Sequence, residues 1–520
     1  MTDAADRIFT DAEGHTLGEP DREFEAVAVR DGRIVRVGSD YEIAFLEGVD
    51  TDVVDCGGRV LLPGFVDAHT HLEMVGRRLV HADLGAAADR DAALERLREA
   101  SGSGPDEWVL GYGYDESTWP DQGFLTREEL DDVSKERPVV AFREDLHTAS
   151  ANSVVFDRYA DEFPEDGVLR NDAGEPTGVV TEAAAELLRT ETAPDREETR
   201  QLVRAARDRA HELGVTGVHD MVRRSHAPAV YRELAVAGEL ALRVRLYYWV
   251  DHLDAVAELG LRTNHGGPFV EVGGIKTYTD GSLGARTAKL WEPYADGDHS
   301  DASEADDPDG AADTGEWVVA PDELASIADR VDDLGLQLAV HAIGDEAIEV
   351  ALEALPDDPD ARHRIEHAEL PPSDLSRWPA GVVASVQPNF LRWAREGGLY
   401  EARLGEERTA AVNPFSAMLE AGTSVAFGSD CMPLDPLYGV QQAVTAPQER
   451  QRLTVTEALR TYTWGSAYAG HAEDRSGTVE AGKRADFVVI EESPWEVDPD
   501  RIADVDVAMT VVDGEVVYSR

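Results

Sequence analysis

Two kinds of segment alternate along this chain: amphipathic segments with the period of a helix, and short runs of apolar residues. Long segments such as 198–214 and 321–335 are amphipathic with the period of a helix, and each ends on a glycine, as helices often do. Short apolar runs follow these segments and predict buried strands. Because alternating helices and buried strands are typical of a parallel sheet covered by helices, the pattern predicts an α/β fold.

Eight apolar runs are candidates for the central sheet, and eight parallel strands are the number that closes a (β/α)8 barrel, or TIM barrel. The first two runs are separated by far more residues than a normal connection contains. The intervening sequence has strand-like runs of its own, WVLGYGY and PVVAFRED. We therefore predict a barrel domain over 62–474 that carries an insertion subdomain at 75–195. The eight runs are 64–69, 214–220, 242–249, 270–278, 336–342, 362–368, 382–388 and 423–430.

The two ends of the chain share one pattern. Near the start, 25–39 consists of two alternating apolar runs joined by an Asp-Gly pair, and 506–520 repeats this arrangement. Asp-Gly between alternating runs is a strong signal for a β-hairpin. We therefore predict a small β domain assembled from both ends, 1–61 and 475–520.

Composition restricts the class of partner. The chain has 48 basic and 104 acidic residues and a formal net charge of −56, which repels nucleic acids and anionic membranes. Arginine replaces lysine almost everywhere, since 44 arginines stand against four lysines; with the spread of acidic residues, this predicts adaptation to high salt. The acidic segment 295–317 is interpreted as a solvated, flexible loop, with an ion site as the alternative.

The cysteines, the N-terminal sequence and the length of the apolar runs indicate the cellular compartment. Two cysteines, Cys56 and Cys431, make no disulfide framework. The N-terminus has neither the basic nor the apolar region of a secretion signal, and no run approaches 18 apolar residues. These features predict a soluble, cytoplasmic protein with a small-molecule substrate, for which a homo-oligomer remains an open option.

Candidate metal ligands stand at the ends of the predicted barrel strands. His69 and His71 are two residues apart, so both imidazoles can face one ion. His341 and His367 end the fifth and sixth strands, and Asp430 ends the eighth. Each alone has a plain alternative as a buried polar residue or a turn cap. Together they lie at the strand ends where barrel active sites form, which predicts a metal site.

Lys276 is the anomaly among the four lysines, because it ends the apolar strand 270–278. Burial disfavours the ammonium form, and a neutral amine can add carbon dioxide to become a carbamate that bridges two metal ions. The alternative is a lysine paired with Asp280 or another acid at the same edge. The residues alone leave both readings open.

Ten motifs, in this order, resemble the amidohydrolase superfamily and specifically its family 3. That subgroup contains N-substituted formamide deformylase-like and exoenzyme regulatory proteins, and the resemblance covers essentially the whole chain. The motifs are LLPGFVDAHTH, GYGYDESTW, REDLHTASANS, GEPTGVVTEAA, IKTYTDGSLGARTA, VHAIGD, RIEHAEL, SVQPNF, AFGSD and GTVEAGKRADFVVI.

The resemblance implies a composite β-sandwich beside a TIM-like barrel, and a metal-dependent hydrolase of carbon–nitrogen bonds. It implies four histidine ligands, N6-carboxylysine at Lys276, and Asp430 as metal ligand and general acid/base. Two divalent ions, most simply Zn²⁺, would share a hydroxide that attacks an amide-like bond of a small molecule. The implied histidine ligands are His69, His71, His341 and His367.

Two alternative functions are less well supported by the sequence. A regulatory or binding protein with little turnover is disfavoured because every implied ligand is present. A deaminase, or a hydrolase of a different bond, is disfavoured by Lys276, since deaminase relatives generally lack the bridging lysine. The substrate stays open.

Residues of the insertion and of the carboxyl ends of the barrel strands are predicted to contact the substrate. Arg143, Asp145 and His147 alternate along a predicted strand end, where they either meet the substrate or form local ion pairs. Asp280 is a further candidate. Glu366 is a candidate to support the ligands, although strand alternation points it away from His367.

Overall fold

The computed structural model describes residues 4–520 except 103–106, 117–118, 145–146, 165 and 298–312. The chain divides into two compact units, one formed by 1–71 with 207–520 and the other by 72–206. Most of the predicted acidic loop, 295–317, falls outside the described residues. None of the helices that the structure does describe is both long and apolar enough to cross a membrane.

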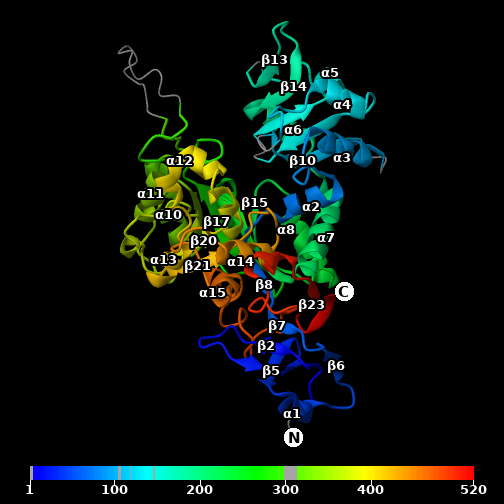
Figure 1. Cartoon of the computed structure of the whole chain (residues 1–520), viewed down its shortest axis with the longest axis vertical. Coiled ribbons are helices and arrows are strands. Elements are labelled where there is room, and N and C mark those ends of the chain that lie inside the picture. Colours follow the sequence, from blue (N-terminus) through cyan, green and yellow to red (C-terminus); the bar gives the residue numbers. More distant parts are fainter. Residues whose placement is uncertain (1–3, 103–106, 117–118, 145–146, 165, 298–312) are drawn as a thin grey trace. The chain divides into compact units, whose positions relative to one another are not determined.

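The larger unit contains a nearly closed barrel of eight parallel strands, as the sequence predicted, with neighbours in the order β8-β15-β16-β17-β18-β19-β20-β21 (Figure 1). Each predicted run forms one strand. The runs 382–388 and 423–430 are longer than their strands, because the residues after Val386 and Phe427 leave the sheet. The strands are β8 (Phe65–Thr70), β15 (Val215–Val222), β16 (Arg243–Trp249), β17 (Val270–Tyr278), β18 (Gln337–Ala342), β19 (Arg364–His367), β20 (Val383–Val386) and β21 (Ser424–Phe427).

The first and last strands meet at their carboxyl ends. The main-chain N–H groups of Ser429 and Asp430 donate to the carbonyl oxygen of His69 at 3.1 and 2.7 Å. Gly428 makes this approach possible, since a Cβ there would lie 2.4 Å from the His69 nitrogen. Main-chain hydrogen bonds thus hold two predicted metal-binding segments side by side.

Amphipathic helices cover the barrel. Helix α10 (Pro321–Asp333) buries Leu324, Ala328 and Val331, which recur four and three residues apart and so share one helical face. The predicted helix 321–335 is confirmed by α10, and 198–214 by α7 (Arg196–Glu212). The other helices of this unit are α1 (Asp40–Ile43), α8 (Ala227–Ala237), α9 (Leu253–Glu258), α10 (Pro321–Asp333), α11 (Asp345–Ala354), α12 (Leu399–Thr409), α13 (Phe415–Glu420), α14 (Pro436–Val444), α15 (Val455–Arg460) and α16 (Ser466–Ala469).

The chain ends form a β-sandwich in the same unit. One sheet has the order β5-β4-β1-β6 and the other β24-β23-β22-β7-β2-β3. Phe9 and Val27 of the first sheet pack against Leu61, Phe487 and Val511 of the second. β22 pairs with β7, which joins the C-terminal segment to the N-terminal one (Figure 1). The strands are β1 (Arg7–Thr10), β2 (Glu13–His15), β3 (Glu23–Phe24), β4 (Ala26–Arg30), β5 (Arg33–Gly38), β6 (Asp52–Asp55), β7 (Val60–Pro63), β22 (Phe487–Ile490), β23 (Val507–Val512) and β24 (Glu515–Ser519).

Both predicted hairpins are present. Asp31 and Gly32 connect β4 to β5 with φ of 50° and 69°, and Asp513 and Gly514 connect β23 to β24 with φ of 55° and 82°. Positive φ at both central residues is the geometry that favours Asp-Gly in two-residue hairpin loops. Local sequence therefore specified these turns.

The smaller unit, 72–206, contains the predicted insertion 75–195. Its sheet has the order β13-β14-β12-β11-β10-β9, and the runs WVLGYGY and PVVAFRED form β10 and β11. The strands are β9 (Ala82–Asp83), β10 (Val109–Tyr114), β11 (Val139–Arg143), β12 (Thr148–Ala151), β13 (Val168–Arg170) and β14 (Pro176–Thr181). The helices are α2 (Leu72–Val80), α3 (Arg90–Gly102), α4 (Arg127–Val133), α5 (Ser153–Arg158), α6 (Glu182–Glu191) and the first part of α7.

Candidate metal centre

Three of the predicted ligands meet where the barrel sheet closes. Nε2 of His71 lies 3.4 Å from Oδ1 of Asp430, and Nε2 of His69 lies 3.8 Å from the same oxygen. One ligand atom from each of the three residues lies within 4.8 Å of the others. Two imidazole nitrogens and a carboxylate oxygen at this spacing fit a divalent ion.

The other two histidines continue this cluster. The ring centroid of His367 lies 4.9 Å from that of His69 and 4.5 Å from that of His341. His367 and Asp430 have φ of 71° and 51°, in the left-handed region that residues with a Cβ rarely adopt. We use the name rim cluster for the five side chains of His69, His71, His341, His367 and Asp430.

Hydrogen bonds determine which ring nitrogen each histidine can offer. Three of the rings use Nδ1 to donate to an acceptor, and His341 uses Nε2 to donate to the Gly281 carbonyl at 2.9 Å. Such a bond fixes the tautomer and leaves the second nitrogen with a lone pair. His341 therefore offers Nδ1, whereas the other three offer Nε2. The acceptors for those three are Glu366 Oε2 (2.5 Å from His69), the Met221 carbonyl (3.0 Å from His71) and Gln387 Oε1 (2.7 Å from His367).

Burial keeps these imidazoles neutral. It lowers the pKa of His69 and His367 well below the usual value, with help from neighbouring positive charges. Burial and then the Lys276 charge lower the pKa of His341 to about 3, and burial lowers the pKa of His71. Neutral imidazole is the form that binds metals, so the set is prepared for ligation at neutral pH.

Lys276 lies near the end of β17 with 1% of its surface exposed. Its Nζ is buried and has no hydrogen-bond partner in the part of the chain that the structure describes. Burial lowers the pKa of Lys276 to about 8, although the carboxylates of Glu366 and Asp430 act in the opposite direction. A substantial fraction of this amine is therefore neutral near pH 8, which is the state that reacts with carbon dioxide.

Asp280 does not pair with Lys276. It is fully buried, and its carboxylate accepts main-chain N–H groups from Lys289 at 2.8 Å, Ile343 at 3.1 Å and Gly344 at 2.8 Å. Burial nevertheless raises the pKa of Asp280 to about 7. In this arrangement Asp280 ties the segment after β17 to the segment after β18.

A charged network inside the barrel supports His69. Arg364 is fully buried and donates to both oxygens of Glu366 at 2.7 and 3.0 Å, to Nδ1 of His219 at 2.9 Å and to the hydroxyl of Tyr247 at 2.8 Å. Glu366 in turn accepts from His69, so it lies inside the barrel and reaches the rim cluster. The sequence analysis did not single out Arg364; the signal was an arginine and a glutamate two positions apart, which share one face of the strand.

The insertion residues lie in the smaller unit, where local ion pairs engage them. Arg143 donates to Glu116 at 2.9 Å and to Asp115 at 3.2 Å. Nδ1 of His147 lies 3.2 Å from Oε2 of Glu182, and 61% of the His147 side chain is exposed. These contacts match the ion-pair alternative, and Asp145 lies outside the described residues.

Comparison with known proteins places the chain in a family. The model of the amidohydrolase family matches residues 52–518. A Bacillus subtilis protein named amidohydrolase YtcJ is 30% identical over 97% of this chain and 98% of its own length, and N-substituted formamide deformylase of Arthrobacter pascens is 28% identical over 100% and 99%. The crystal structure of an uncharacterized metal-dependent hydrolase from Pyrococcus furiosus superimposes with a TM-score of 0.77, at 29% identity over 94% of this chain and 100% of that one. The chain therefore belongs to the amidohydrolase family of hydrolases.

Proposed function

We propose that this protein hydrolyses an amide-like, non-peptide carbon–nitrogen bond of a small molecule, with two divalent metal ions, most simply Zn²⁺, as cofactors. The observation that carries the proposal is the chemistry of the rim cluster. Four neutral imidazoles, each with one nitrogen held by an acceptor, converge with Asp430 beside the buried amine of Lys276. A site for an anion would need donors, whereas this one offers the lone pairs that a cation binds.

The residues divide into ligands and their supports. His69, His71, His341 and His367 would bind the ions through the nitrogens left free, and Asp430 would contribute an oxygen. Lys276, as N6-carboxylysine, would bridge the two ions; its buried, unpartnered Nζ supports this assignment. When bound, such ions polarise a substrate carbonyl and bring the pKa of a water molecule near neutrality.

Asp430 is the residue that we assign to proton transfer. Its carboxylate oxygen lies 3.4 Å from Nε2 of His71 and 3.8 Å from Nε2 of His69, so it would stand beside the ions and the water that they activate. Asp430 would accept a proton from that water as the carbon–oxygen bond forms. It would then return the proton to the nitrogen that leaves when the carbon–nitrogen bond breaks. Glu366 and Arg364 would act through His69 by fixing its ring.

The test is a hydrolysis screen of N-formyl, N-acyl and cyclic amides in high salt, with the metal content measured on the same samples. The name of the Arthrobacter relative makes N-substituted formamides the first compounds to try. Asp430→Asn should lower kcat about 100- to 10,000-fold, which is the usual contribution of a general base. Asp329→Asn, on the exposed face of α10, is the matched control and should leave kcat unchanged.

Two results would contradict the proposal. One is turnover that is unaffected by complete removal of metal with a chelator. The other is an Asp430→Asn variant as active as the control on every substrate that the native protein cleaves.

A further inference from the structure

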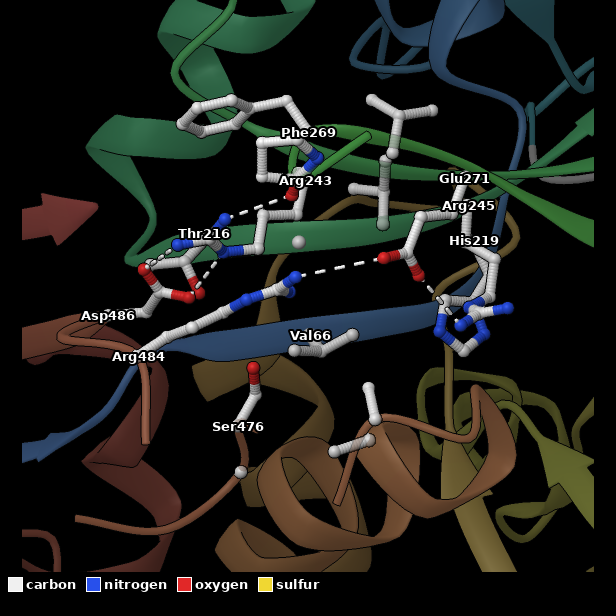
Figure 2. Close-up of a pocket in the computed structure, with 18 of the residues that line it drawn as sticks. Val66, Thr216, His219, Arg243, Arg245, Phe269, Glu271, Ser476, Arg484 and Asp486 are labelled. Carbon is white, nitrogen blue, oxygen red and sulfur yellow. Dashed lines mark hydrogen bonds and ion pairs between the residues drawn. The ribbon is translucent and has the colours of Figure 1, made fainter. Parts of the chain in front are cut away.

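A second polar site lies at the other end of the barrel. A cavity of about 60 Å³ opens beside the amino ends of β8, β15 and β16, whereas the rim cluster lies at the carboxyl ends (Figure 2). Its opposite wall is the segment 467–486, which leads into β22 of the β-sandwich. We call it the junction cavity, and define it by Val66, Thr216, Arg243, Ser476 and Arg484. It is larger than one water molecule requires.

Positive charge is in excess around this cavity. Four arginines and three carboxylates meet here, although the chain as a whole carries a net charge of −56. The three carboxylates pair closely with three of the arginines, and the fourth arginine shares Glu271 at a longer distance. The ion pairs are Arg243 with Asp486 (2.6 Å) and Asp513 (3.0 Å), and Glu271 with Arg245 (3.0 Å) and Arg475 (2.9 Å).

Arg484 is that fourth arginine. Only 10% of its side chain is exposed, and its nearest carboxylate oxygen, on Glu271, is 3.7 Å away. Within the described residues its guanidinium donates no hydrogen bond. Burial and the nearby charge of Arg243 lower the pKa of Arg484 to about 10, although Asp486 and Glu271 act in the opposite direction. Burial of a guanidinium that shares one distant carboxylate with two other arginines is costly, and a bound anion would lower that cost.

A second donor faces the same space. The hydroxyl oxygen of Ser476 is buried and has no hydrogen-bond partner among the residues that the structure describes. Figure 2 shows this hydroxyl directed toward the side chain of Arg484. A guanidinium supplies paired N–H donors that match the oxygens of phosphate or sulfate, and a hydroxyl supplies a further donor.

We propose that the junction cavity binds a small inorganic oxyanion, phosphate or sulfate, held by Arg484 and Ser476. Because the barrel strands form one wall and the segment leading to β22 forms the other, the bound anion would connect the barrel to the β-sandwich. A ligand that binds only the folded protein stabilises it in proportion to its occupancy. The site is separate from the rim cluster and does not depend on the proposed hydrolysis.

The first experiment measures Tm while phosphate or sulfate replaces chloride at constant ionic strength. Tm should rise and saturate with either oxyanion. Arg484→Gln should raise the apparent Kd at least about tenfold, the effect of losing one charge-assisted hydrogen bond. Arg501→Gln removes the same charge from an exposed position of this unit, with 63% of the side chain exposed, and should leave Kd unchanged.

Equal responses to chloride and to the oxyanions, or equal Kd values for Arg484→Gln and Arg501→Gln, would overturn the proposal. If Arg484→Gln fails to fold, Ser476→Ala serves instead, since it removes only the hydroxyl and should raise Kd severalfold. The two oxyanions compared separately show which one binds more tightly.

The second experiment locates the anion. Crystals of the native protein grown with selenate, whose selenium scatters X-rays anomalously, should show a peak beside Arg484 and Ser476. The Ser476→Ala crystals should show a weaker peak at the same place. Absence of a peak in the native crystals would refute the site.

Discussion

The two ends of the barrel bury polar groups in opposite ways. At the carboxyl ends, acceptors hold one nitrogen of each histidine, so the atoms left over carry lone pairs and suit cations. At the amino ends, arginines outnumber the carboxylates, so Arg484 has only a shared contact with Glu271 at 3.7 Å, and the hydroxyl of Ser476 is buried without a partner among the described residues; both are donors, which suit an anion. The polar groups that a buried network leaves unsatisfied therefore indicate the charge of the ligand that the site can bind.

The largest effect is expected from removing the Lys276 amine, which lies at the carboxyl ends of the barrel strands. Lys276→Ala should lose one or both metal ions and lower kcat by roughly 1,000-fold or more, because the bridging ligand is gone. Lys276→Arg should not recover activity, since a guanidinium stays charged and forms no carbamate. Short carboxylic acids added to Lys276→Ala should restore some turnover by supplying oxygens. Lys135→Ala, at an exposed lysine, is the control.

Elemental analysis and steady-state kinetics on the same preparations measure this prediction. The mass of native protein kept under carbon dioxide checks for the carbamate directly. A fully metallated and active Lys276→Ala protein would refute the bridging role.

At the amino end, Asp486→Asn should destabilise the fold by about 3 kcal/mol, because it leaves the buried Arg243 with Asp513 as its one carboxylate partner among the described residues, besides the Pro268 carbonyl. Burial alone would raise the pKa of Asp486, but the charge and hydrogen bonds of Arg243 outweigh it and lower that pKa. A lowered pKa stabilises the fold above the ordinary value near 4, and this stabilisation is lost as pH falls below it.

Denaturant unfolding from pH 7 to pH 3 checks this prediction. The difference in stability between the native protein and Asp486→Asn should shrink as the solution becomes more acidic. Asp500→Asn, an exposed change in the same unit, should follow the native curve. A difference that stays constant with pH would contradict the ionic role of Asp486.

Glu366→Gln tests how the interior network supports the carboxyl end. The amide keeps the shape but removes the charge that His69 and Arg364 share, so metal affinity should fall about 10- to 100-fold. Metal titration measures this loss, and Glu353→Gln at an exposed position of α11 is the control. Unchanged affinity would mean that Glu366 serves stability alone.

The smallest expected effect concerns the smaller unit. His147→Ala should change the relative rates among amide substrates a fewfold while metal content stays the same, because the residue is exposed and its ion pair with Glu182 lies in the smaller unit. Competition between two substrates in one reaction measures the ratio. Loss of metal in this variant would contradict a role limited to substrate choice.

Much of the molecule could be predicted from local pattern. Eight apolar runs predicted the eight barrel strands, and two Asp-Gly pairs predicted two hairpins. The histidines, Asp430 and Lys276 could be named because strand ends in a barrel converge on one edge. The charge composition predicts adaptation to high salt, which remains a prediction.

Tertiary structure decided the finer chemistry. Glu366 contacts His69, almost 300 positions away, and this contact depends on strand register and on the closure of the sheet. The same register puts Gly281 against His341, which selects Nδ1 as its free nitrogen, and brings Arg484 to the amino ends of the strands. The sequence by itself determined which residues stand at each strand end, because periodicity is a local property. Which donors and acceptors were left unsatisfied depended on partners distant in sequence, and only the folded chain sets those distances.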